Sequence, residues 1–157
     1  MTISELQQQI IDEIIRITSD MSMSGKDGEL KRLKGYKQAI PIFTAYSDEP
    51  EEDGEDLFPY FVVRVDNITY HGENGNAASI MIMFAIYDED EKQRGYYTLT
   101  SIMERVIMRF QKDRVLGRFF CDGKMAMQYQ EDDSYPQFFG GIEMVWYLPE
   151  IEMEGLW

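Results

Sequence analysis

The amino-acid sequence predicts an α+β fold, with a single, mostly antiparallel sheet of about five strands and two main helices packed on one face. Two stretches repeat apolar residues at helical spacing, and five others combine β-branched and aromatic residues in the manner of strands. Their order along the chain, α-β-β-β-α-β-β, is typical of such a fold. Because 157 residues with 44% hydrophobic side chains bury one core, we expect a single domain over residues 1–157.

The first helix is predicted over residues 3–19. Apolar side chains recur there at spacings of three and four, namely at Ile3, Leu6, Ile10, Ile14 and Ile17. Thr2 with Glu5, or Ser4 with Gln7, offers a capping box at its start. Residues 20–35 are polar, hold three glycines and lack periodicity, so we expect a flexible loop with at most one helical turn at 29–34.

Three strands are predicted between the two helices. The first covers residues 36–46, and Pro41 within it favours an edge position because proline lacks a backbone donor. The second, near 60–66, and the third, near 78–87, form a hairpin that closes between Glu73 and Asn76. The third strand is almost entirely apolar, as expected for a central strand covered on both faces.

The second helix is predicted over residues 95–112 and has the clearest amphipathic pattern in the chain. One face carries Leu99, Ile102, Met103, Val106 and Phe110. Two strands follow, over 124–130 and 140–148, the second with Ile142, Met144, Trp146 and Leu148 in alternation. We interpret the methionines of the strands, such as Met81 and Met83, as core residues; the alternative is a sheet face that repacks against partners.

Negative charge is the most unusual bulk property of the chain. It carries 29 acidic and 15 basic residues, and 14 of the acids lie in three short runs, at 48–56, 88–91 and 131–133. The other 15 acids balance the bases, so the excess belongs to these three segments, each of which we predict to be a loop. Such a molecule should repel nucleic acid in bulk, because affinity for DNA comes mainly from cations that displace phosphate counterions.

The acidic segment 47–57 has three interpretations: a metal site, a solvated loop, or a charged surface that faces a polyanion. As a calcium-binding EF-hand loop it matches poorly. Alignment on Gly54 puts Pro50 at position 2 and Tyr60 at position 12, where calcium needs a bidentate carboxylate. We therefore expect a solvated loop and no metal site.

The sequence indicates no catalytic centre or cofactor site. His71 is the only histidine and Cys121 the only cysteine, so a zinc site or a thiol nucleophile would need this one pair, and nothing in the pattern brings them together. No glycine loop for phosphate precedes a helix. We expect a non-enzymatic protein. The apolar runs stay shorter than the ~18 residues of a bilayer span, and acids interrupt the N-terminal apolar stretch, so we expect neither a membrane segment nor an export signal.

Arg105, Arg109 and Lys112 form a basic stripe on the second predicted helix. Such a stripe is usually a solvated face. In this chain it also offers a complement to an acidic loop of a neighbouring copy, because a head-to-tail ring needs two different patches on each subunit. We therefore predict a subunit interface in which these three residues meet Glu51, Glu52 and Asp53 of the next copy.

Three segments of the chain, which together run from about residue 40 to 154, resemble a known family. They are "AIPIFTAYSDEPEEDGEDLFPYFVVRVDN", "IYDEDEKQRGYYTLTSIMERVIMRF" and "YPQFFGGIEMVWYLPEIE". In their order and spacing they are similar to the tail-terminator proteins of long-tailed phages, also called tail-completion or head-tail joining minor capsid proteins. The shared features are an acidic spacer before Phe58-Pro59-Tyr60, an acidic turn before a helix, and a closing strand with a central Trp146.

The resemblance implies a virion structural subunit that forms a hexameric ring on the finished tail tube and joins it to the head. The implied partners are further copies of the chain, the tail tube protein and a head-completion or connector protein, while DNA passes without specific binding. The implied location is the tail-head junction of the virion, and the host cytoplasm during assembly. In such a ring Asp88, Glu89, Asp90 and Glu91 would contribute to an acidic rim or channel.

Two other classes of protein stay open on the sequence alone. A DNA-mimicking inhibitor would carry acids along a helix or strand face, whereas here the excess lies in predicted loops. A small enzyme of unrecognised type would bring several perturbed acids together in a pocket.

Overall fold

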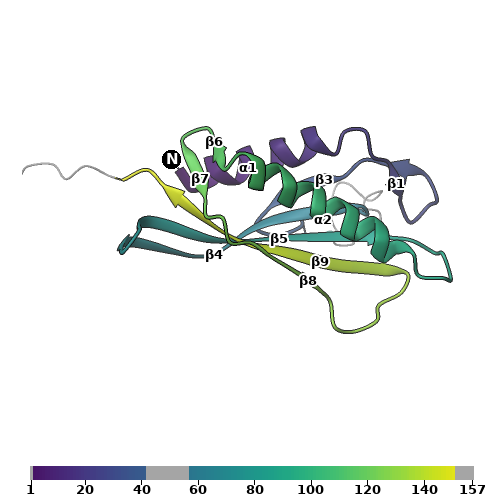
Figure 1. Cartoon of the computed structure of the whole chain (residues 1–157). Coiled ribbons are helices and arrows are strands. Elements are labelled where there is room, and N and C mark those ends of the chain that lie inside the picture. The colour runs from purple at the N-terminus through teal and green to yellow at the C-terminus, as the bar shows by residue number, and fades with distance from the viewer. Residues whose placement is uncertain (1, 42–56, 151–157) are drawn as a thin grey trace, which may run out of the picture.

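The computed structural model describes residues 2–41 and 57–150, and within them it is an α+β fold built on one mostly antiparallel sheet (Figure 1). The helices are α1 (Thr2–Ile17) and α2 (Gly95–Lys112). The strands are β1 (Met23–Ser24), β2 (Leu30–Lys31), β3 (Lys34–Lys37), β4 (Tyr60–Gly72), β5 (Gly75–Tyr87), β6 (Val115–Leu116), β7 (Phe119–Cys121), β8 (Ala126–Tyr129) and β9 (Gln137–Leu148).

The main sheet has seven strands in the described part of the chain, more than the five predicted. Their order is β3-β4-β5-β9-β7-β6, and β8 pairs with β9 beside β7. All pairs are antiparallel except β3 with β4, where Lys34 is level with Tyr60 and Lys37 with Val63. β3 is an edge strand, but it ends at Lys37, so residues 38–41 of the predicted strand, Pro41 among them, are not in a strand and the prediction that Pro41 lies within it is wrong. Residues 42–46 of the predicted strand lie outside the described residues.

The three central strands β4, β5 and β9 form the frame of the molecule. Phe61 pairs with Phe84, which in turn pairs with Gly140, so side chains at these positions share one face of the sheet. α1 lies over β3 and β4, and α2 lies over β5 and β9, on that same side (Figure 1). β6 and β7 curl up beside α1, where Arg118 Nη2 donates to Glu5 Oε2 at 2.7 Å. The two helices therefore lie on the sheet, and β6 and β7 flank them at one end.

The core lies between the two helices and the sheet. The predicted face of α2 is confirmed, because Leu99, Ile102, Met103, Val106 and Phe110 are all fully buried. The alternating residues of β9 are buried as predicted, and the Trp146 ring meets the Phe110 ring edge-on with their centroids 5.2 Å apart. At ~25 cal/mol per Å², burial of such large side chains is the main favourable contribution to folding.

Two further sequence predictions about local structure are wrong. The helical turn at 29–34 does not form, because Leu30 and Lys31 pair as a strand with Met23 and Ser24, and β3 begins at Lys34. The segment 20–35 is therefore a small hairpin rather than an unstructured loop. Asp27 closes it by accepting a hydrogen bond from the backbone N–H of Glu29 at 3.1 Å, a local bond that periodicity does not reveal.

The prediction that the third strand is covered on both faces is also wrong. In β5, Ala78, Ile80, Ile82 and Phe84 are buried, whereas Met81 is half-buried and Met83 is 40% exposed. Both helices lie on the side of Ile80 and Ile82, and the described residues place no helix on the other side. We call this other side, which carries Arg64, Met81, Met83, Glu143 and Val145, the open face.

Candidate functional site

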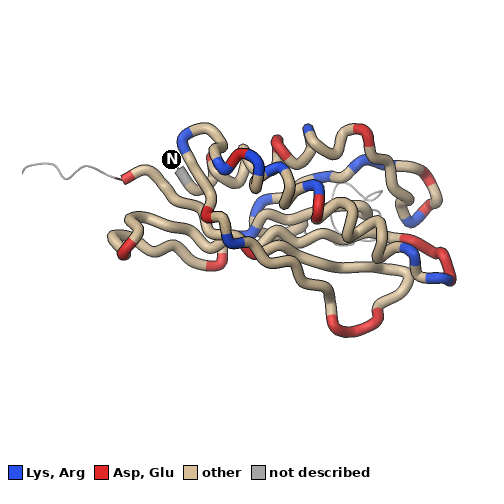
Figure 2. Tube along the Cα trace, in the orientation of Figure 1, with Lys and Arg blue, Asp and Glu red and all other residues tan. Residues whose placement is uncertain are grey.

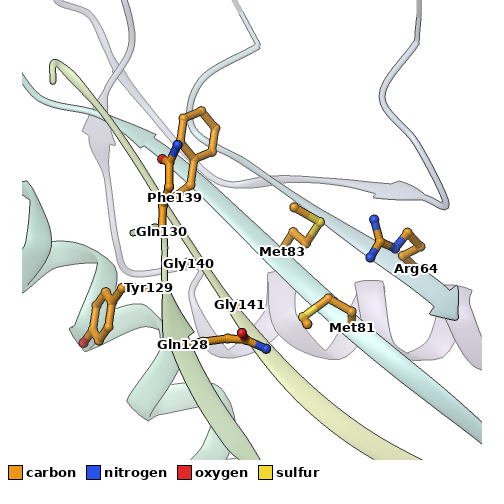
Figure 3. Close-up of a pocket in the computed structure, with 9 residues that line it drawn as sticks. All are labelled: Arg64, Met81, Met83, Gln128, Tyr129, Gln130, Phe139, Gly140 and Gly141. Atoms are coloured by element: carbon orange, nitrogen blue, oxygen red, sulfur yellow. The ribbon is translucent and has the colours of Figure 1, made fainter. Parts of the chain in front are cut away.

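The open face is hollowed near the middle of the sheet. A depression of about 430 Å³ lies there, lined by Arg64, Met81, Met83, Gln128, Tyr129, Gln130, Phe139, Gly140 and Gly141 (Figure 3). Its floor is low because Gly141, which faces this side of the sheet opposite Met83, carries no side chain where β9 runs between β5 and β8. A methyl group at Gly141 would come within 2.9 Å of the Met81 sulfur. The depression therefore depends on glycine at this position.

The walls of the depression combine apolar and polar groups. Met81 and Met83 of β5 lie beside Arg64 of β4 on one side, and Gln128 of β8 lies on the other (Figure 3). Arg64 Nε donates to Asp66 Oδ1 at 3.0 Å, and both side chains are partly exposed. Flexible methionines beside a charged group suit the contact of another polypeptide better than the tight binding of a small molecule. This arrangement agrees with the alternative that part of the methionine set forms a sheet face for partners.

An aromatic cluster closes one end of the open face. The Phe58 ring contacts the rings of Tyr60, Tyr87 and Phe139, with centroid separations between 5.2 and 6.2 Å. Burial raises the pKa of the Tyr60 hydroxyl above its ordinary value. Phe58 and Pro59, which the sequence places directly after the acidic segment, are thus packed onto the sheet.

The basic stripe on α2 is largely engaged within its own chain. Arg109 Nε donates to Glu13 Oε1 of α1 at 2.7 Å, and Arg105 Nη1 donates to Asp20 Oδ1 at 2.6 Å. Arg105 Nη1 also donates to the carbonyl of Ile17 at 3.1 Å, the last residue of α1. These contacts join the two helices, and they occupy the guanidinium groups that we predicted to meet another copy. Lys112 is exposed and has no ion pair with any described residue.

The Arg109 contact is the better shielded of the two. The side chains of Arg109 and Glu13 are only 18% and 13% exposed. The hydrogen bond from Arg16, followed by the bond from Arg109, holds the pKa of the Glu13 carboxyl below its ordinary value despite the opposing effect of burial. A single glutamate therefore anchors two arginines at the interface between the helices.

The acidic run at 88–91 is a structured turn before α2. Asp88 Oδ1 accepts from the backbone N–H of Asp90 at 2.9 Å, and Asp90 Oδ1 accepts from the backbone N–H of Lys92 at 3.1 Å. The hydrogen bond from Arg94, followed by the bond from the backbone N–H of Lys92, lowers the pKa of the Asp90 carboxyl. The Tyr87 hydroxyl donates to Glu89 Oε1 at 2.8 Å. Of the four, Glu89 and Glu91 are exposed, whereas Asp88 and Asp90 are half-buried.

Figure 2 shows runs of acids on loops at the ends of and below the sheet, and charges of both signs along the two helices. The run at 131–133 is exposed throughout. Glu51, Glu52 and Asp53 lie outside the described residues, so the structure does not locate the acids of the predicted interface.

Reactive groups in the described part of the chain are few and separated. Cys121 is buried, and burial raises the pKa of its thiol to about 11, which keeps it protonated and unreactive near neutral pH. His71 is exposed at the tip of the β4–β5 hairpin. Residues 2–41 and 57–150 hold no group of three or more His, Cys, Asp or Glu side chains placed to bind a metal ion. The helices in these ranges are also too short or too polar to cross a bilayer.

The sequence was compared with known protein families and with curated proteins. No family and no curated protein matches it.

Sequence patterns did not predict the depression on the open face. Its signal is weak: two adjacent glycines, Gly140 and Gly141, in a strand that otherwise alternates, the second of them opposite Met83. Glycine inside a strand often marks a place where another chain or a ligand comes close to the backbone. On this basis the glycine pair predicts a contact site on β9.

Proposed function

We propose that this chain is a non-enzymatic virion structural protein, which forms a homo-oligomeric ring at the end of a phage tail tube and joins the tail to the head. The proposal starts from the resemblance of residues 40–154 to tail-terminator proteins. Its partners would be further copies of itself, the tail tube protein and the head-completion or connector protein, at the tail-head junction.

The observation that carries the proposal is the two-sided construction of the sheet. One face is sealed by α1 and α2, whereas the open face carries a mixture of methionine, glycine, arginine and glutamate. A subunit of a ring needs one side that holds its own core and other surfaces that meet neighbours or line a passage. A fold with every face closed would leave fewer surfaces for these contacts.

The charge distribution supports passage of DNA without binding. The chain carries a net charge of −14, and 14 of its 29 acids are in three short runs. In a ring, the exposed Glu89 and Glu91 would add to an acidic rim, and Lys112 would supply the cation for an acidic loop of the next copy. Repulsion of phosphate would then keep DNA from adhering during transit.

The test is genetic and structural. A stop codon early in the gene, in the phage or prophage that carries it, should yield tail tubes of unregulated length and heads without tails in electron micrographs. Supplying the intact gene from a plasmid should restore virions of normal tail length. Normal virions in the absence of the protein would contradict the proposal.

A further inference from the structure

Two strand edges of the main sheet have no neighbouring strand in the described part of the chain. β4 pairs with β3 only over Tyr60–Val63, and the side chain of Gln38 satisfies Val65 just beyond it. From there to the end of β4 the outer edge has no strand beside it. On the opposite side of the sheet, β8 pairs with β9 along one edge only. Both free edges carry an exposed aromatic side chain, Tyr70 at 56% and Tyr129 at 42%.

The ladders determine which backbone groups point away from the sheet at these edges. The carbonyl of Val145 accepts from the N–H of Asp122, away from β5, so its partner Ser79 points its backbone groups toward β4, and Ala77 does the same. Asn67 and Thr69, which pair with Ser79 and Ala77, therefore point inward to β5, and the direction alternates along the strand. The N–H and C=O groups of Ile68 and Tyr70 therefore face outward. In β8, the N–H of Gln130 donates to the carbonyl of Phe139, so by the same alternation Met127 and Tyr129 face outward.

The side chains of these outward-facing residues lie on the same face of the sheet. Ile68 pairs with Ala78, and Met127 pairs with Ile142, and both partners are buried in the core beneath the helices. Residues opposite each other in a ladder must have their side chains on one face. If the two edges joined, the helix-covered face of one copy would thus continue into that of the next. If the outward-facing residues of the two edges had their side chains on opposite faces, each copy would be inverted relative to the one before it.

We infer that β4 of one copy pairs with β8 of the next, antiparallel, with Ile68 opposite Tyr129 and Tyr70 opposite Met127. The inference rests on the ring of the proposed function and assigns its interface to a second copy of the chain. The strand directions fit: β4 and β9 both run antiparallel to β5, and β8 runs antiparallel to β9, so β8 is antiparallel to β4. The pairing joins two unlike edges and therefore repeats head to tail.

The stagger between the free edges sets the tilt of the strands in the assembly. Within one copy, Tyr129 is level with Gly140, Phe84 and Phe61 in successive strands. Placing Tyr129 beside Ile68, which is level with Ala78, shifts each copy by the six residues of β5 from Phe84 to Ala78. The shift along the strands is thus ~20 Å per copy, and the four strands of one copy are together ~19 Å wide. The ratio of the two lengths sets the tilt. The resulting tilt is close to ~45°, at the steep end of the tilt of strands in closed barrels.

Oppositely charged residues meet at the hairpin end of the pairing. The register that puts Tyr70 opposite Met127 brings Glu73, in the hairpin turn, level with Lys124 of the next copy. At the other end, Arg64 comes near Asp133, and Asp66 comes opposite Glu131, so an attractive and a repulsive pair lie side by side. Glu73, Lys124 and the acids 131–133 are exposed in the single chain, and Arg64 is partly exposed.

The test is disulfide cross-linking of the full chain. Thr69 and Gln128 lie opposite each other in this register, both on the open face and both exposed. Such a non-hydrogen-bonded pair has Cα atoms ~4.5 Å apart, within reach of a disulfide. Thr69→Cys with Gln128→Cys should give a covalent ladder of oligomers on mild oxidation. Ile68→Cys with Gln128→Cys, which places the two thiols on opposite faces, should not, and the buried native Cys121 is common to both.

A second variant tests the backbone bonds directly. Tyr70→Pro removes an outward N–H without breaking a bond between β4 and β5. The variant should therefore fold, but its mass in solution should be that of the monomer. Tyr70→Ala keeps the N–H and should remain oligomeric. An oligomer that survives Tyr70→Pro, or forms without the 69–128 ladder, would overturn the edge pairing and leave the proposed function standing. A chain that is monomeric at every concentration would overturn the ring on which both depend.

Discussion

Gln7 and Gln38 meet through a hydrogen bond of 3.1 Å, from the amide Nε2 of Gln7 on α1 to the amide oxygen of Gln38 just after β3. Gln7 Nε2 also donates to the carbonyl of Val63 at 2.9 Å. Gln38 uses both ends of its amide on the backbone N–H and C=O of Val65, each at 3.0 Å. The pair thus continues the sheet beyond β3 with side chains in place of a strand, and it ties α1 to the same edge.

Replacement of Gln7 by methionine tests this network, because methionine has a similar length and no amide. The Gln7 side chain is 6% exposed, and its loss removes the buried hydrogen bond to the carbonyl of Val63. We expect the free energy of unfolding to fall by about 1 to 3 kcal/mol, measured by denaturant titration. Gln8→Met, at the exposed neighbouring position, is the control and should change stability by less than about 0.5 kcal/mol. Equal effects from both variants would contradict the role of Gln7.

Replacement of Ile102 by aspartate tests the buried face of α2. Ile102 is fully buried, and an unpaired buried charge costs several kcal/mol against a total stability of ~5 to 15 kcal/mol. We expect the variant to be unfolded by circular dichroism at room temperature. Ser101→Asp places the same charge on the exposed face of the helix and should remain folded. A folded Ile102→Asp protein with an unchanged melting temperature would show that the helix packs differently.

The contact between Glu13 and Arg109 predicts a pH dependence of stability. A carboxyl whose pKa is lower in the folded chain than in the unfolded chain stabilises the fold above its ordinary value of 4.5, and this contribution is lost as the pH falls through the lower, folded value. Glu13→Gln removes the contribution. We therefore expect the difference in unfolding free energy between the native chain and Glu13→Gln to shrink as the pH is lowered below ~4.5. A difference that stays constant from pH 7 to pH 3 would contradict this.

The arginines of α2 should differ from Lys112 when their charges are reversed. Arg109→Glu puts a second carboxylate against Glu13, so the melting temperature should fall. Lys112→Glu disturbs no ion pair with a described residue and should leave the melting temperature within about 2 °C. If Lys112 contacts an acidic loop of another copy, the same variant should still reduce the oligomer mass. Unchanged mass would remove Lys112 from the interface.

The acidic segment 47–57 should behave as a solvated loop. Addition of millimolar calcium should leave the melting temperature unchanged, because only a ligand that binds the folded state stabilises it by mass action. Lysine at Glu51, Glu52 and Asp53 should leave the fold of the subunit intact and should impair head-tail joining in a complementation assay. Saturable calcium binding near micromolar, with a matching thermal shift, would favour a metal site instead.

Long, strongly periodic elements were predictable from the sequence, and contacts between distant segments were not. The apolar residues of α2 recur at spacings of three and four and so predict where the helix begins and ends. Residues at these spacings share a helix face in any surroundings. The two-residue strands β1, β2 and β6 are too short to show alternation. The run of apolar residues in β5 led to the prediction that both faces of the strand are covered. The prediction fails because an apolar side chain such as Met83 can also lie on an exposed face.

The candidate site was predictable only in its charges. The sequence identified the acidic runs at 88–91 and 131–133 as exposed loops, and the structure places them there. It could not predict that Arg105 and Arg109 face α1, because their partners Asp20 and Glu13 lie about 85 to 96 residues away in the chain. The depression on the open face likewise depends on a glycine of β9 and methionines of β5, which lie far apart in the chain.

The single-sided cover of the sheet has a consequence for how the sequence can change. Along β5, packing in the core restricts which residues can replace Ile80 and Ile82. At Ser79, Met81 and Met83, only the contacts of the open face restrict substitution. A library of all single substitutions, selected first for solubility and then for assembly of infectious particles, should show tolerance that alternates residue by residue in the first selection. In the second selection the alternation should disappear, and the positions at which it disappears would trace the footprint of the partner on this strand.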